Sequence, residues 1–187
     1  MVMRVRAVRG EEWERVRELR LASLRDEAAP VAFLETYERA SAQPDSFWQA
    51  RAEGAASGTD VRQFVAETDD GVWAGSVVVL VEKAGEVSVL GDEIPSGSAQ
   101  LVAVYVRPEY RGRGVLAELF EAAQGWARSV EGVERVRLFV HEENGRARAA
   151  YAKCGFELTG ESVPVSGAAE VGSGARELEM VAGRSQG

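Results

Sequence analysis

The sequence is poor in the two residue types that carry most metal-binding and nucleophilic chemistry. Among its 187 residues there is one cysteine, Cys154, and one histidine, His141. A lone cysteine forms no intramolecular disulfide and no cysteine-based zinc cluster. A mechanism of the serine–histidine or cysteine–histidine type would depend on His141 alone. We therefore expect no metal site, and the residues that most hydrolase mechanisms require are scarce.

The sequence also lacks a long apolar run and an excess of basic residues. No stretch approaches the ~18 apolar residues of a membrane-spanning helix, and the N-terminus has no signal-type apolar core. The 22 lysines and arginines are outnumbered by 30 aspartates and glutamates, which gives a net charge of −8. A nucleic-acid-binding protein usually has the opposite sign of charge, or a basic stripe. These absences predict a cytoplasmic protein that binds neither membrane nor nucleic acid.

What is present is the composition of an ordinary globular domain. Hydrophobic residues make up 45% and charged residues 28% of the chain, which is close to the globular average and argues against disorder. The length suits a single domain over residues 1–187. The acidic balance mildly favours a basic amine as substrate, whereas an anionic substrate would need a local basic site of its own.

Hydrophobic periodicity predicts helices and strands along the whole chain. Apolar residues at steps of three and four indicate helices over residues 11–27, 32–42, 45–54, 115–126 and 144–154. Alternating or continuous apolar runs predict strands over residues 3–8, 63–67, 72–81, 99–106, 135–140, 156–158 and 176–181. Pro30 is expected to end the first helix and Gly54 the third. A Gly/Ser-rich loop is expected over residues 166–174.

A glycine-rich turn lies between the strand at 99–106 and the helix that follows it. Its sequence is Arg111-Gly112-Arg113-Gly114-Val115-Leu116. Such a turn at a helix N-terminus exposes backbone N–H groups that have no intrahelical partner. The helix dipole and the two arginines add positive charge, and glycine lets a phosphate approach the backbone closely. The turn is therefore a candidate phosphate site.

Three interpretations of this turn compete. It could only tighten a strand-to-helix connection. It could bind a dinucleotide, because residues 112–117 also fit G-x-G-x-x-G/A, but that fingerprint follows its strand almost at once, whereas residues 107–111 intervene here. A Walker-type phosphate loop is excluded because no G-K-[ST] follows. The third interpretation depends on a second motif further along the chain.

The two motifs together resemble those of one known family. Residues 104–114, which read VYVRPEYRGRG, look like the coenzyme A motif Q/R-x-x-G-x-G/A of the GCN5-related N-acetyltransferase (GNAT) family. Residues 144–156, NGRARAAYAKCGF, resemble that family's second signature, N-x-x-A-x-x-x-Y-x-x-x-G-F. Two signatures joined by a helix and a strand are far more specific than either one alone. The order of the expected elements matches this family over most of the chain.

The resemblance implies a fold, a co-substrate and a reaction. The fold is α/β and acyl-CoA N-acyltransferase-like: a mixed, largely antiparallel central sheet, flanked by helices on both faces and splayed in the middle. The co-substrate is acetyl-coenzyme A, whose acetyl group passes directly to a primary amine of a small molecule or peptide. The main alternative is a non-catalytic module that holds acetyl-coenzyme A. The sequence identifies neither the acceptor nor whether the protein is a homodimer.

The resemblance also assigns roles to individual residues. Backbone groups of Val104, Tyr105 and Val106 would pair with the pantetheine arm of the cofactor, and Asn144 would contact it. Tyr151 would protonate the departing thiolate. Leu116 stands where Gly or Ala is usual in the family. The amides that would bind the diphosphate are those of Arg111, Gly112, Arg113, Gly114, Val115 and Leu116.

Removing a proton from the amine requires a base or a water relay. Family members often carry a glutamate on the strand before the turn, and the matching position here is Gln100, which could position a water. Glu67, at the end of a neighbouring strand, either faces the cleft or is a solvated strand end. For Tyr151 the alternative is core packing. His141 is expected on the surface, and Cys154 as a small buried apolar residue.

Overall fold

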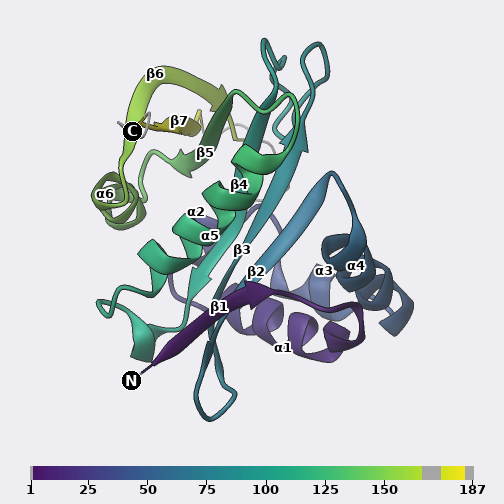
Figure 1. Cartoon of the computed structure of the whole chain (residues 1–187). Helices are drawn as coiled ribbons and strands as arrows, with labels where there is room; N and C mark the ends of the chain where they lie inside the picture. Colours follow the sequence, from purple (N-terminus) through teal and green to yellow (C-terminus); the bar gives the residue numbers. More distant parts are fainter. Residues whose placement is uncertain (1, 166–173, 184–187) are drawn as a thin grey trace.

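A computed structural model describes residues 2–165 and 174–183 of the chain (Figure 1). Its centre is a seven-stranded sheet in the order β1-β2-β3-β4-β5-β7-β6. The β4–β5 pair is parallel and every other neighbouring pair is antiparallel. The mixed, largely antiparallel sheet expected from the sequence is thus confirmed. The strands are β1 (Met3–Ala7), β2 (Val61–Thr68), β3 (Trp73–Glu82), β4 (Ser98–Val106), β5 (Arg135–His141), β6 (Phe156–Pro164) and β7 (Arg176–Ala182).

Helices cover both faces of the sheet. Figure 1 shows α5 (Val115–Ser129) crossing in front of the strands, with α6 (Gly145–Lys153) beside the end of the sheet that β5, β7 and β6 form. Apart from the short 3-10 helix η2 (Pro108–Tyr110), which follows β4, the remaining helices precede β2 in the chain. Two of them, α1 and α4, pack against each other on the opposite face. These N-terminal helices are η1 (Gly10–Glu12), α1 (Trp13–Leu24), α2 (Ala29–Ala32), α3 (Tyr37–Ser41) and α4 (Asp45–Ser57).

Strand alternation gives each face of the sheet a core of its own. On β2, Phe64 and Ala66 belong to the core under α5, whereas Val65 belongs to the core under α1 and α4. Phe120 of α5 is 1% exposed and packs edge-on against Phe156. Full burial of a side chain of this size contributes about 2–3 kcal/mol. The apolar stripe of α5 therefore fixes this helix, and the turn that precedes it, against the sheet.

Several helix boundaries differ from those expected. The first helix ends at Leu24, and Pro30 lies in the first turn of α2. A backbone N–H at this position would have no acceptor within the helix, so proline is tolerated there. Within residues 32–42 only α3 and the last residue of α2 are helical. Gly54 does not end α4, which continues to Ser57. A glycine inside a helix costs about 1 kcal/mol, which the burial of neighbouring alanines against the sheet offsets.

The C-terminal strands also extend beyond their apolar signal. β6 continues to Pro164, although the sequence pattern predicts a strand only over 156–158. Most of its residues are exposed because it forms the edge of the sheet and pairs with β7 on one side only. An edge strand has no second neighbour that demands apolar side chains, so its pattern is weak. Residues 166–173 of the expected Gly/Ser-rich loop lie outside the described residues.

The sheet is open between the ends of β4 and β5. The two strands pair from Ser98–Arg135 to Leu101–Leu138 and then separate. At the same level β4 contains a bulge, because Ala103 and Val104 together lie opposite Val77 of β3. Ala103 has a φ of +51°, a left-handed conformation that costs an alanine about 1–2 kcal/mol. A bulge bends its strand, and this one turns β4 away from β5. The splay expected from the sequence is confirmed.

Candidate active site

The glycine-rich turn presents unbonded backbone N–H groups at the N-terminus of α5. Gly112 and Gly114 adopt φ angles of +74° and +81°, and a Cβ at either position would meet nothing within 4 Å. Among the described residues, the N–H groups of residues 112–117 donate to no acceptor, whereas those on either side, of Arg111 and Glu118, are bonded. A row of free donors at a helix N-terminus is a site for an anion, and a diphosphate fits its chemistry.

The two arginines of the turn have different surroundings. Arg111 is folded back: its Nε donates to the carbonyl of Val106 at 2.9 Å, and its Nη2 binds the carboxylate of Asp26. Its amide donates to Pro108, so the prediction that the Arg111 N–H is available to the diphosphate is not matched by this geometry. Arg113 is exposed and lies over the ring of Tyr110. Of the two guanidiniums, that of Arg113 is free to meet a phosphate.

The β4 residues expected along the pantetheine arm lie beside the opening of the sheet. Val104 and Val106 pack against the core under α5, as does Leu116 at the start of α5. Tyr105 points to the other face and is 9% exposed. Within residues 2–165 and 174–183, the edge of β4 that faces β5 has no strand partner beyond Leu101. Backbone groups along such an edge can pair with an extended ligand as with another strand.

Asn144 and Tyr151 lie on α6, which follows β5. Asn144 is the N-cap of this helix, and its side-chain oxygen accepts a hydrogen bond from the Ala147 N–H at 3.2 Å. The ring of Tyr151 lies 5.5 Å from that of Phe120, centre to centre. Burial raises the pKa of Tyr151 above its ordinary value, with contributions from Cys154 and Glu177. Its hydroxyl bonds to no described residue, so it keeps a proton that it can donate.

Comparisons with known proteins place this geometry in a family. The model of the acetyltransferase (GNAT) family matches residues 13–156. The chain belongs to this family. A search among curated proteins finds no significant match.

Solved GNAT structures share the fold along nearly the whole chain. A GNAT acetyltransferase from Streptococcus pneumoniae has a TM-score of 0.70 and 17% identity, over 96% of this chain and 98% of its own. AAC(6')-Iy, in complex with the bisubstrate analogue CoA-S-monomethyl-acetylneamine, has a TM-score of 0.66 and 23% identity, over 89% and 97%. A phosphinothricin acetyltransferase from Sinorhizobium meliloti, in complex with AcCoA, has a TM-score of 0.68 and 16% identity, over 97% and 88%.

In this GNAT chain the two candidates for amine deprotonation have contrasting surroundings. Gln100 lies on β4 at the last pairs before the opening, is 2% exposed, and its side-chain oxygen has no hydrogen-bond partner among the described residues. Glu67 is engaged by two guanidiniums, at 2.9 Å by Arg6 and at 3.0 Å by Arg15. Glu67 therefore neither stands free in a cleft nor projects into solvent.

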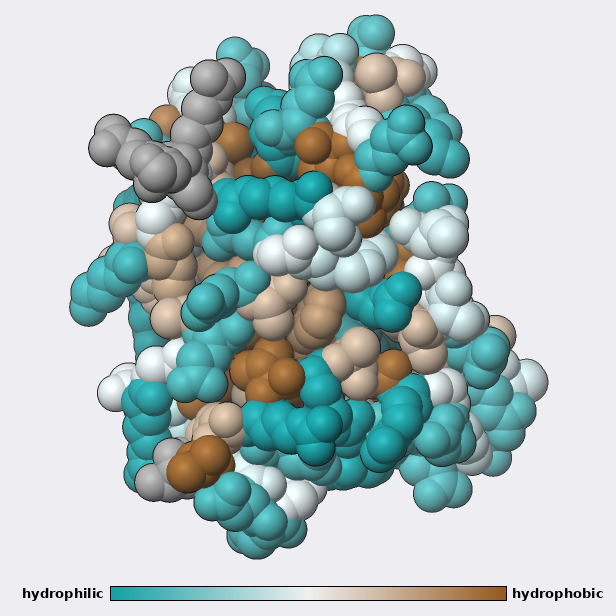
Figure 2. Space-filling model, in the orientation of Figure 1, coloured by the Kyte–Doolittle hydropathy of each residue, from teal (hydrophilic) through white to brown (hydrophobic). Residues whose placement is uncertain are grey.

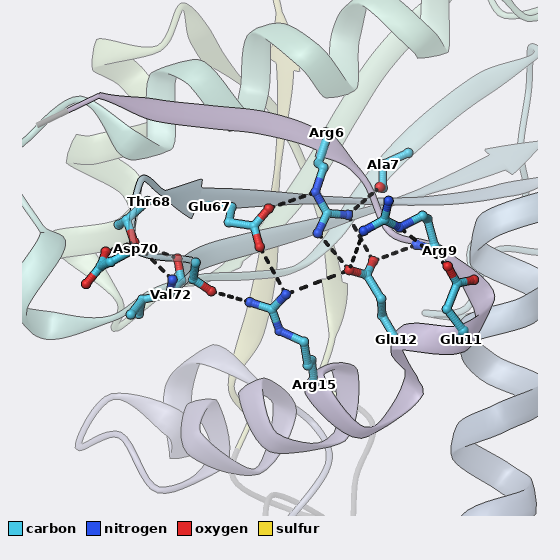
Figure 3. A network of polar contacts seen from close by, with 11 residues as sticks. Arg6, Ala7, Arg9, Glu11, Glu12, Arg15, Glu67, Thr68, Asp70 and Val72 are labelled. Atoms are coloured by element: carbon cyan, nitrogen blue, oxygen red, sulfur yellow. Dashed lines mark hydrogen bonds and ion pairs between the residues drawn. The ribbon is translucent and has the colours of Figure 1, made fainter.

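Figure 3 shows the network of polar contacts to which Glu67 belongs. Arg6 of β1 lies between Glu67 and Glu12, and its Nη2 is 2.7 Å from a carboxylate oxygen of Glu12. The hydrogen bond from Arg6 lowers the pKa of Glu67, and Arg15 lowers it further against the opposing effect of burial. The hydrogen bonds that Arg6 donates to Glu12 lower the pKa of Glu12 to about 2. The network ties β1, β2 and the start of α1 together.

The structure also shows the surroundings of His141 and Cys154, for which the sequence offered only a weak case for a catalytic role. His141 is 3% exposed, so its expected place on the surface is wrong; the end of β5 is covered because β7 pairs with it there. Its Nδ1 accepts a hydrogen bond from the Glu143 N–H at 3.1 Å. Cys154 is partly buried against the core under α5, and burial raises the pKa of its thiol. It packs as a small apolar residue, as expected.

Sequence reasoning missed three features in and around the candidate site. Ala103 gave no signal for its left-handed backbone, because alanine rarely adopts one. Asp26 lies in a polar stretch after α1, and only the fold brings it to Arg111. A pocket beside Ala103, between the sheet and α1 and α4, contains the side chains of Arg20 and Arg51. The two arginines lie 31 positions apart in the chain, so no local sequence pattern links them to one site.

The outer surface is mainly polar. Figure 2 shows one face as largely hydrophilic, with hydrophobic areas confined to separate patches. In the described part of the chain, no helix combines the length and the apolar character that crossing a bilayer requires.

Proposed function

We propose that this protein transfers the acetyl group of acetyl-coenzyme A to a primary amine of a small molecule or peptide, by direct attack and without a covalent enzyme intermediate. The observation that supports this most strongly is the pairing of two features. The free N–H groups of residues 112–117 can hold a diphosphate, and the opened edge of β4 leads from them into the sheet. Neither the dinucleotide interpretation nor a purely structural turn accounts for the opening.

The residues of the opening each have a part in binding. The N–H groups of Gly112, Arg113 and Gly114, with those of Val115 and Leu116, would hold the diphosphate. The β4 backbone at Val104, Tyr105 and Val106 would pair with the pantetheine arm, and Asn144 would contact the cofactor from the start of α6. Acetyl-coenzyme A supplies an acetyl group activated as a thioester. The bulge at Ala103 would bring that group to the face of the sheet that α1 and α4 cover.

Tyr151 is proposed as the acid of the reaction. The amine nitrogen bonds to the acetyl carbon, the carbon–sulfur bond breaks, and the sulfur leaves with the electron pair. Tyr151 Oη gives its proton to this sulfur and regains one from solvent. A negative sulfur is costly in a partly desolvated site, so a proton donor held beside it favours the departure. The raised pKa of Tyr151 keeps the phenol protonated until that moment.

The proton that the amine loses is proposed to leave through water. The unpartnered side-chain oxygen of Gln100 can accept a hydrogen bond from a water molecule and orient it toward the amine. Glu67 would contribute at most through such a water, since Arg6 and Arg15 hold its carboxylate and lower its pKa. The solved relatives named above include one with an acetylneamine analogue, which is consistent with an amine acceptor. We further propose that the enzyme works in the cytoplasm.

A pair of substitutions at Gly114 tests the cofactor site. Asp and Asn have nearly the same shape, and both meet the same backbone strain at a φ of +81°. Gly114→Asp adds a negative charge beside the diphosphate, whereas Gly114→Asn does not. We expect calorimetry to show coenzyme A binding about tenfold or more weaker for Asp than for Asn. Equal affinity in two folded variants would contradict the site. Release of free thiol with a panel of amines separates an enzyme from a non-catalytic binding module.

A further inference from the structure

A small pocket lies next to the bulge of β4, on the face of the sheet that α1 and α4 cover. Ala103 and Tyr105 of β4 line one side of it, and side chains of the two helices line the other. Ala103 marks the place where β4 leaves β5. Under the proposed function, the acetyl group arrives at this place, so the pocket is where the attacking amine would be held.

Two arginines carry the charge of this pocket. Arg20 comes from α1 and Arg51 from α4, and the described residues that line the pocket include no carboxylate. The side chain of Arg20 is 13% exposed, and its Nε lies 3.0 Å from a carboxylate oxygen of Glu35. Arg51 has no hydrogen bond and no carboxylate partner among residues 2–165 and 174–183; its guanidinium lies 5.7 Å from the ring centre of Trp48.

Among the described residues, the carboxylate of Glu35 compensates one of the two positive charges, and the charge of Arg51 has no counter-ion. Burial lowers the pKa of Arg51, and the nearby positive charge of Arg20 lowers it further, with Glu35 opposing. An arginine nevertheless stays protonated at neutral pH. A partly buried charge without a counter-ion is unfavourable, and an anion that enters the pocket removes that cost.

The sheet side of the pocket offers neutral polar groups instead. Gln63 of β2 donates from Nε2 to the hydroxyl oxygen of Ser76 of β3 at 2.8 Å. The side-chain oxygen of Gln63 and the hydroxyl proton of Ser76 bond to no described residue. An amide oxygen of this kind accepts a hydrogen bond from an amine. The pocket thus has a cationic side at the helices and a hydrogen-bonding side at the sheet, close to the bulge.

We propose that the acetyl acceptor is a small primary amine that also carries a carboxylate, such as a free amino acid, and that Arg51 binds this carboxylate. A guanidinium pairs with a carboxylate through two parallel hydrogen bonds, which fixes orientation as well as position. With the carboxylate at Arg51, the amine faces Gln63, Ser76 and the bulge. The protein as a whole is acidic, with a net charge of −8. The attraction for a carboxylate therefore comes from Arg20 and Arg51 and not from the overall charge. The prediction that such an acceptor is acetylated rests on the proposed function, whereas the prediction that it binds does not.

The test compares each L-amino acid that has a neutral side chain with its own carboxamide, which keeps the amine and side chain but lacks the negative charge of the carboxylate. Binding to the full chain without coenzyme A is measured by calorimetry. At least one acid is expected to bind about tenfold or more tightly than its amide, because hydrogen bonds to charged groups contribute ~1.5–3 kcal/mol. Arg51→Gln should abolish this preference. Arg39→Gln, which removes the same charge from an exposed site on α3, should keep it.

A turnover assay by thiol release, with acetyl-coenzyme A in excess, gives the second measurement. Arg51→Gln should raise the KM for the acid about tenfold or more, with little change in kcat and no change for the amide. Wild-type protein that binds amides as well as acids overturns the inference, and this comparison needs no variant. If carboxylate-free amines are acetylated and amino acids are not, the inference fails while the proposed function stands. If amino acids bind through Arg51 but coenzyme A does not bind, the pocket assignment stands and the proposed function fails.

Discussion

The guanidinium of Arg111 binds the carboxylate of Asp26, which joins the glycine-rich turn to the segment that follows α1. The side chain of Asp26 is 8% exposed. Burial alone would raise the pKa of Asp26, but hydrogen bonds from the Ala28 N–H and from Arg111 outweigh it, so this pKa is lowered. One ion pair therefore holds the proposed cofactor turn and the acceptor-side segment in a fixed relation.

Replacing Asp26 should destabilise the protein. We expect Asp26→Asn to lower the free energy of unfolding at pH 7 by about 1–3 kcal/mol, since the partly buried guanidinium of Arg111 loses its charged hydrogen-bond acceptor. Because the folded pKa of Asp26 is lowered, its contribution is present above the unfolded pKa near 4 and is lost as the pH falls below it. Urea unfolding at pH 7 measures the change. Asp45→Asn, which breaks the exposed pair with Arg17, should cost less than about 0.5 kcal/mol. Equal losses in the two variants would contradict the assignment.

Replacing Tyr151 should slow the chemical step selectively. Tyr151→Phe removes the hydroxyl and keeps the ring that packs on Phe120. We expect kcat to fall about 10²-fold or more, the usual range for a lost general acid, with acetyl-coenzyme A affinity nearly unchanged. Pre-steady-state turnover of both proteins with the same amine measures the step. A change of less than about threefold would assign Tyr151 to core packing.

Replacing Glu67 should affect stability more than turnover. Its carboxylate is held by Arg6 and Arg15, and its pKa is lowered, so it is a poor proton acceptor at neutral pH. We expect Glu67→Gln to leave kcat within about threefold of wild type. Gln100→Glu, assayed alongside, should leave activity similar or raise it. Loss of turnover in a folded, cofactor-binding Glu67→Gln protein would show instead that Glu67 is the base.

The network of Figure 3 should weaken in acid. The pKa of Glu12 falls from 4.5 to about 2 in the folded protein, and its side chain is 8% exposed. Its contribution is thus complete above pH 4.5, is lost as the pH falls toward 2, and is on the order of 2–3 kcal/mol. Glu12→Gln should lower the free energy of unfolding at pH 7 and matter progressively less between pH 4.5 and 2.5. A pH-independent difference between the two proteins would exclude this ion pair as the cause.

The sequence was most informative where one local pattern determines the structure. The apolar stripe of α5 and the glycines at 112 and 114 encode a helix and its turn within a few neighbouring residues. The matching signatures at Gly114 and Tyr151 then identified the family, which the family model confirms over residues 13–156. The roles of the single site residues stay predictions.

Features that arise from residues far apart in the chain were not predictable in this way. Nothing near Arg20 or Arg51 in the sequence shows that the packing of α1 against α4 brings both side chains to one pocket. His141 looked like a surface residue because nothing near it in the sequence shows that β7 covers the end of β5. Asp26 and Arg111 meet only because a turn on one side of the sheet and a loop after α1 converge.

Because β4 and β5 pair over only a short stretch, the stability of the sheet depends partly on what binds in the opening between them. Strands β1–β4 form one half of the sheet and β5–β7 the other. In the part of the chain that the structure describes, only the pairing of Ser98–Leu101 with Arg135–Leu138 joins the two halves. At a seam of this kind, the two halves of the sheet can separate locally at a free-energy cost below that of global unfolding. A pantetheine arm paired with β4 would bridge the gap, and a ligand at a hundred times its Kd adds about 2.7 kcal/mol to folded-state stability. The lifetime of this protein in a cell would then follow the supply of its own co-substrate.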